Sequence, residues 1–344
     1  FIVEPVEVAE PVEATVDLSA DSPVEELVVG TIDESAESPS AGISHIDGAM
    51  TERCKSNEDF SKKNLRIQVS AKHLTLASPI FKNILTGGWK ESVTLLQQGS
   101  MELTTSGWDL EALLLLLKII HCQHDHIPRK LSLEMLAKIA VIADYYDCKK
   151  ILRFFLDVWI GNLAEVPEIY CRDLVLWLWV SWVFKLPRQF ERASSISISQ
   201  SKYRIRGLAL PIPNHVLDAM NSRREHSIED LVHLLHTQHA TFLNDTNGCS
   251  FECRSIMYGA LTKQMQSNEL LSPMPVTPFT GLSYQGLAQK VRSFKSPQWR
   301  SSSPGYPSYG PHSCFHSTFE PLFGHLHDRI GGLALDDDNL DVQA

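Results

Sequence analysis

Polar and apolar residues alternate from Leu65 to Ser70, with the two-residue period of a half-buried strand. A helix is predicted after Ser78, because this favourable N-cap residue precedes Pro79 and a run of apolar residues that ends at Gly87 and Gly88. Two short β-like stretches follow at residues 93–96 and 101–105.

The next segments predict helices. Residues 108–121 are densely apolar and should form a buried helix, with Asp109 and Glu111 in the first turn, where negative charge suits the helix dipole. Ser132 opens a second helix that leads, through residues 144–148, into a third that ends near Trp159. This order of strands and helices indicates an α+β fold and not the regular alternation of a parallel α/β sheet.

The pattern from Leu65 to Trp159 resembles the BTB/POZ family, in particular its versions from filamentous fungi. The similarity covers about 95 of the 344 residues. It is carried by Val69–Leu74, by Leu76–Lys82, by the apolar run Leu113–Ile120 and by Leu136–Cys148. The resemblance implies a domain for protein interaction that associates with itself or docks to a cullin-type ubiquitin-ligase scaffold.

Two departures from the family concern its contacts. The family's first long strand, which pairs in many dimers, is not recognisable before Leu65, and only Val28 and Val29 offer a faint candidate. The family's Y-T-G turn is replaced by Ile120–Gln123, so no cullin-contact residue is assigned.

Helical patterns continue beyond Gly161. The apolar run Leu174–Phe184 has eleven residues, whereas a membrane span needs about 20, so we expect a buried helix with core anchors at Trp177, Trp179 and Trp182. Residues 216–242 carry one apolar stripe, typical of a long helix that packs on a neighbour. Shorter apolar patterns follow at residues 255–265 and 282–294.

Both ends of the chain differ in composition from this middle part. Residues 1–50 hold twelve acidic residues and no Lys or Arg, so they account for −12 of a net charge of −10 and leave +2 for the rest. We predict a disordered leader at residues 1–59 and a low-complexity tail at 296–344. The near-neutral body gives a nucleic-acid partner little electrostatic support, and no membrane partner is expected because the one long apolar run is too short to span.

The seven cysteines are an odd number and are widely spaced. Several lie within apolar helical patterns, where a reduced thiol behaves as a small hydrophobic group. This use of cysteine indicates a reducing compartment, cytoplasmic or nuclear, and no secretory signal is recognisable.

The densest set of potential metal ligands is His121, Cys122, His124 and His126. Structural zinc sites usually use two separated pairs of ligands, and these four are crowded, so a polar loop after a helix is the preferred interpretation. A metal-binding or catalytic protein that uses residues 121–126 is retained as an alternative.

Further cysteines and histidines lie beyond residue 230. Cys249 and Cys253 could form a ligand pair one helical turn apart, but structural thiols are the preferred interpretation. His233, His236 and His239 are expected on a solvated helix face. No role is assigned to the His and Cys residues of the tail, which are His312, Cys314, His316, His325 and His327.

No nucleophile elbow, Walker loop or dinucleotide-binding glycine motif is present in the sequence. We therefore assign no catalytic, cofactor-binding or metal-binding residue. The sequence predicts a BTB/POZ-like domain at residues 60–160, an all-α extension at 161–295 and a non-enzymatic adaptor that binds protein and no small-molecule substrate. A transcription or chromatin regulator is the other alternative, although the sequence offers no DNA-binding unit.

Overall fold

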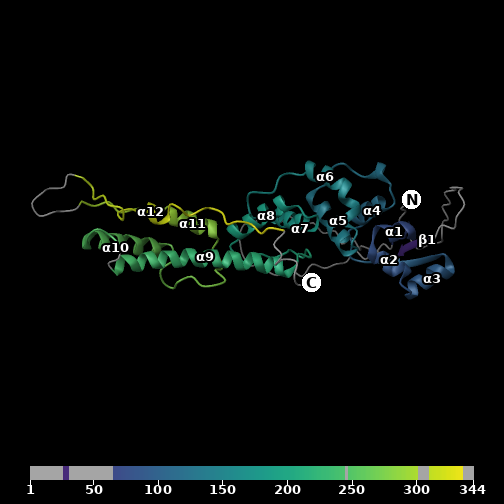
Figure 1. Cartoon of the computed structure of the whole chain (residues 1–344), viewed down its shortest axis with the longest axis horizontal. Coiled ribbons are helices and arrows are strands. Elements are labelled where there is room, and N and C mark those ends of the chain that lie inside the picture. The colour runs from purple at the N-terminus through teal and green to yellow at the C-terminus, as the bar shows by residue number, and fades with distance from the viewer. Residues whose placement is uncertain (1–25, 31–64, 245–246, 301–309, 336–344) are drawn as a thin grey trace, which may run out of the picture. The chain divides into compact units, whose positions relative to one another are not determined.

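A computed structural model describes residues 26–30, 65–244, 247–300 and 310–335. The chain divides into two compact units, Phe1–Leu163 and Ala164–Ala344. Helices dominate the described part of both units (Figure 1). No helix within the described ranges is long and apolar enough to cross a membrane.

Unit 1 contains a sheet of three short strands in the order β2-β1-β3. The central strand β1 (Glu26–Gly30) runs antiparallel to β2 (Ile67–Ser70) and parallel to β3 (Ser100–Thr104). In this register Val28 lies opposite Gln68 of β2 and Glu102 of β3.

The position of β1 corrects the prediction of a leader without structure over residues 1–59. The strand lies at Val28 and Val29, where the sequence offered only a faint candidate. Its partners are distant along the chain, and a short apolar stretch does not reveal which strands it will pair with. The remainder of the leader lies outside the described residues.

The helices of unit 1 begin largely where the sequence predicts. The Ser78 hydroxyl accepts a hydrogen bond from the backbone N–H of Phe81, and the Ser132 hydroxyl accepts one from Met135. Both serines therefore cap their helices. The elements are α1 (Ala71–Ala77), α2 (Pro79–Thr86), α3 (Lys90–Gln98), α4 (Leu110–Ile120), η1 (His124–His126), α5 (Leu133–Tyr145), η2 (Lys149–Leu152) and α6 (Arg153–Asn162).

Helix α3 replaces the strand predicted at residues 93–96. Glu91 lies in its first turn, and Gly99 ends it in the left-handed conformation with φ of 70°. Ser92 and Leu95 are its buried residues, which is the three-residue spacing of a helix face. The helix-end features at Glu91 and Gly99 therefore outweighed the β-like composition of residues 93–96.

Unit 2 begins with α7 (Arg172–Val183) and α8 (Pro187–Gln200), which pack on each other. Trp177 and Trp179 are buried, as expected for core anchors, whereas Trp182 is half-buried. Its ring lies beneath the Lys185 ammonium, 4.3 Å from the ring centre. No strand occurs among the described residues of this unit.

The long helix α9 (Asn214–Leu243) packs against α10 (Phe251–Ser267) and α11 (Tyr284–Arg292) (Figure 1). Its predicted apolar stripe is buried at Met220, Ile228, Leu231, Leu235 and Phe242. From Ile228 onward these side chains join a core that includes Met257, Leu261 and Leu287 from the neighbouring helices.

Residues 310–335 depart from the predicted tail. Phe319 and Phe323 of the segment that contains α12 (Glu320–Phe323) are buried, and Phe294 lies 6.2 Å from Phe323 between ring centres. Burial of a Phe side chain stabilises a fold by about 1.5–3 kcal/mol. The low-complexity composition of residues 296–313 predicted a tail, so Phe319 and Phe323 beyond it were not recognised as core residues.

Candidate functional site

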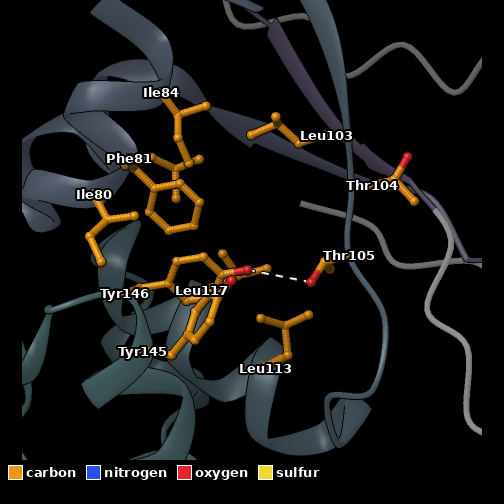
Figure 2. Close-up of a pocket in the computed structure, with 11 residues that line it drawn as sticks. Ile80, Phe81, Ile84, Leu103, Thr104, Thr105, Leu113, Leu117, Tyr145 and Tyr146 are labelled. Carbon is orange, nitrogen blue, oxygen red and sulfur yellow. Dashed lines mark hydrogen bonds between the residues drawn. The ribbon is translucent and has the colours of Figure 1, made fainter. Parts of the chain in front are cut away.

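An apolar pocket of about 440 Å³ lies in unit 1 (Figure 2). Its side chains come from α1, α2, α4, the end of α5, and β3 with the residue that follows it. The polar side chains that line it are hydroxyl-bearing, and none is charged. The lining residues are Leu74, Ile80, Phe81, Ile84, Leu103, Thr104, Thr105, Leu113, Leu117, Tyr145 and Tyr146.

Aromatic contacts fix one wall of this pocket. The Tyr146 ring stacks on Phe81 with 4.4 Å between centres, and its hydroxyl lies 3.4 Å from the Thr105 hydroxyl (Figure 2). The buried Ser78 hydroxyl donates a hydrogen bond to the Tyr146 carbonyl while it caps α2. A cap residue of α2 thus also positions the end of α5.

Tyr145 stands at the rim and remains 60% exposed. Its ring meets those of Tyr146 and Trp108 edge-on, at 4.9 and 5.0 Å between centres. Sequence reasoning did not find this pocket, because its residues are distributed over five elements. The only local signal was the aromatic pair at the end of a predicted helix.

The ligand candidates at residues 121–126 do not converge. His121 is buried, its Nδ1–H donates to the Leu117 carbonyl at 2.7 Å, and its Nε2 accepts from the Ser70 backbone N–H at 2.9 Å. Burial lowers the pKa of His121. Cys122, His124 and His126 are exposed. With both ring nitrogens engaged, His121 serves the packing of α4 against β2.

A second cluster in unit 2 brings together Cys249, Cys253, His312 and Cys314. One potential ligand atom of each residue lies within 4.8 Å of the others. The Cys253 and Cys314 sulfurs are 3.7 Å apart, and Cys249 Sγ lies 3.3 Å from His312 Nε2. Within the described ranges this is the one group of three or more His, Cys, Asp or Glu residues arranged to hold a metal ion.

Local structure holds three of the four members of this cluster in place. Cys253 lies in the first turn of α10 and donates its backbone N–H to the capping hydroxyl of Ser250. The His312 ring stacks on the Trp299 ring with 4.6 Å between centres, and the backbone N–H of His312 donates to the Trp299 carbonyl. The Cys314 N–H donates to the Ser317 hydroxyl.

The thiols differ in acidity. Burial raises the pKa of the Cys253 thiol to about 11. Burial also acts to raise the pKa of Cys314, but hydrogen bonds from His312, the His316 backbone and the other two thiols outweigh it and lower this pKa to about 7. A low-pKa thiol is a better nucleophile and metal ligand than an unperturbed one.

Two separated pairs, Cys249 with Cys253 and His312 with Cys314, make up this cluster. The first pair was expected to be structural thiols, and the second was expected to lie in a tail without a role. The signal that could have joined them was a Cys pair one helical turn apart followed by a downstream His-x-Cys pair.

The remaining histidine candidates have other surroundings. His236 Nε2 lies 2.8 Å from the Leu270 carbonyl, and His239 Nε2 lies 2.8 Å from the Thr262 hydroxyl. These two residues therefore tie α9 to its neighbours and do not form the solvated face that was expected. His325 and His327 are exposed.

No family model matches this chain, and no curated protein matches it.

Proposed function

We propose that unit 1 is a non-catalytic protein-interaction module of the BTB/POZ type and that its pocket receives apolar side chains of a partner protein. The predicted core segments, Leu74, Phe81, Leu113–Ile120 and Leu136–Cys148, support the proposal because they pack in one unit with a small sheet. The helical unit 2 would brace or recruit a second partner.

The observation that carries the proposal is the chemistry of the pocket. Its uncharged lining offers no counter-charge to a phosphate, carboxylate or ammonium group, so it suits an apolar ligand. A volume of about 440 Å³ has room for more than one large side chain. The exposed Tyr145 at the rim belongs to a residue type that is enriched among the residues that dominate binding energy at interfaces.

The resemblance to the BTB/POZ family suggests two kinds of partner. One is a second copy of this chain, and the other is a cullin-type ubiquitin-ligase scaffold. The proposal places such contacts in the cytoplasm or nucleus, where thiols stay reduced.

A matched pair of variants tests the role of the pocket. Ile84→Glu places a carboxylate in the half-buried pocket wall, whereas Phe154→Glu makes the same kind of change at a side chain on α6 that is 80% exposed. Full-length wild type and both variants are used to capture partner proteins from cells. A captured partner is then purified, and its affinity for each of the three proteins is measured.

We expect Ile84→Glu to weaken that affinity at least about tenfold, which corresponds to 1.4 kcal/mol, and Phe154→Glu to leave it unchanged. Light scattering on the purified chain measures self-association in the same variants. Equal affinity of all three proteins, or recovery of a bound lipid or other small apolar molecule from the pocket, would contradict the proposal.

A further inference from the structure

The four ligand residues of unit 2 form a site that is independent of the proposed interaction module. We propose that Cys249, Cys253, His312 and Cys314 bind one structural Zn²⁺ ion, which fixes residues 310–335 to the start of α10. The four side chains come from two parts of the chain, residues 249–253 at the start of α10 and residues 312–314, which are separated by the rest of α10 and by α11.

The distances match a tetrahedral site. Zinc–sulfur bonds of about 2.3 Å and zinc–nitrogen bonds of about 2.0 Å, set at tetrahedral angles, place two sulfurs about 3.8 Å apart and a sulfur about 3.5 Å from a nitrogen. The observed separations are 3.7 Å for Cys253 and Cys314 and 3.3 Å for Cys249 and His312. Small side-chain movements would bring the remaining pairs, which lie within 4.8 Å, to the same spacing.

The donor set selects the metal and its role. Three thiolates and one imidazole are a structural zinc combination, and they leave no position for water or substrate. Calcium and magnesium prefer oxygen ligands, which this set does not supply. When zinc binds, the thiol protons are released to solvent, and the ion bonds to three Sγ atoms and to Nε2 of His312.

The surroundings prepare these ligands for a cation. Cys253 lies in the first turn of α10, where its backbone N–H donates to the capping hydroxyl of Ser250 and holds the thiol in place. The stacked Trp299 orients the His312 ring, and the Ser317 hydroxyl accepts from the Cys314 N–H while it donates to the Cys314 carbonyl. Contacts of this kind around the ligands raise metal affinity because they reduce the ordering that binding requires.

The site lies at one end of a segment that is docked along unit 2. Farther along, the Ser195 hydroxyl donates to the Ile330 carbonyl, and the hydroxyls of Ser194 and Ser199 accept from the N–H groups of Leu333 and Ile330. Between these contacts and the metal ligands lie the buried Phe319 and Phe323. The ion would therefore hold the first end of a segment whose second end is hydrogen-bonded to α8.

The first experiment measures metal content. The full chain is purified under reducing conditions without chelator, and zinc is quantified by mass spectrometry. We expect about one zinc per chain in wild type and loss of nearly all of it in Cys253→Ser/Cys314→Ser. The matched control is Cys122→Ser/Cys171→Ser, which changes two thiols outside the cluster and should retain the metal.

A second measurement remains valid if the double variant fails to fold. Wild-type protein is stripped and titrated with Co²⁺, whose absorption should show thiolate-to-metal charge transfer and tetrahedral d–d bands. Hydrogen exchange in peptides from residues 310–335 should quicken when chelator removes the metal and slow again when zinc is restored. Peptides from unit 1 should not change.

Three results would overturn the assignment. Wild type could contain no zinc and show no tetrahedral cobalt spectrum, or the ligand variant could fold and keep as much zinc as the control. Alternatively, protein isolated without oxygen could carry a Cys253–Cys314 disulfide, which the adjacent sulfurs would permit after a small movement. None of these results bears on partner binding by unit 1.

Discussion

Arg224 of α9 is completely buried, and its guanidinium donates hydrogen bonds to four backbone carbonyls. Its Nε donates to Ser201, and its two terminal nitrogens donate to Pro278, Phe279 and Leu282 at 2.7–3.0 Å. Burial lowers the pKa of this guanidinium. One side chain thus joins α9 to the segment after α8 and to residues 278–282, which are also linked to each other by the bond from the Gly281 N–H to the Lys202 carbonyl.

Replacement of Arg224 by Met should cost about 3–4 kcal/mol in the free energy of unfolding of unit 2. Four carbonyls would lose their donors, at a net value of about 1 kcal/mol for each bond, and removal of the buried charge offsets part of this loss. Arg224→Lys should cost about 2 kcal/mol, because a compact ammonium cannot span carbonyls that a planar guanidinium reaches.

Hydrogen exchange followed by mass spectrometry measures this effect locally. For Arg224→Met, we expect peptides from α9 and from residues 278–282 to exchange several hundredfold faster than in wild type, since 1.4 kcal/mol corresponds to a factor of ten. Arg188→Met, at an exposed arginine of α8, is the control. If the two variants exchange alike, Arg224 does not hold these loops and the reasoning is wrong.

Three further predictions follow from close contacts. Gly332→Ala should cost about 2 kcal/mol and speed exchange in residues 326–335, because a Cβ there would lie 1.9 Å from the Glu191 carbonyl oxygen; Gly331→Ala, whose Cβ meets nothing within 4 Å, should have little effect. Ser78→Ala should lower the stability of unit 1 by about 1–2 kcal/mol in urea unfolding, because it removes both a helix cap and the bond to Tyr146. Since the pKa of His121 is lowered in the folded state, the unfolded chain takes up its proton first as the pH falls below about 6.5, and unit 1 should lose stability there. His121→Gln should flatten this pH dependence, and an unchanged slope would show that another group causes it.

Helix caps and the spacing of apolar residues predicted much of the secondary structure. Ser78 and Ser132 cap helices as predicted, and the apolar stripe of α9 is buried where its spacing indicates. Such features depend on residues a few positions apart, so a short window of sequence contains the relevant interactions. The prediction of a strand at residues 93–96 was wrong, because Glu91 and Gly99 favour the two ends of a helix, α3, over that stretch.

The candidate sites depended on contacts between distant residues. The pocket takes its lining from five elements, and the Cys and His cluster joins two pairs that the sequence separates by α10, α11 and part of a low-complexity segment. The sequence contained each of these residues but no sign of their convergence.

The sequence by itself determined the position of most helices and the near-neutral charge of the chain beyond its acidic first 50 residues. The tertiary structure decided that Glu26–Gly30 is the central strand, that residues 310–335 are docked on unit 2, and that four potential ligands meet there. The physical reason is that helices form from neighbouring residues, whereas strand pairing, close backbone approach at Gly332 and metal-ligand geometry arise only when distant segments pack together.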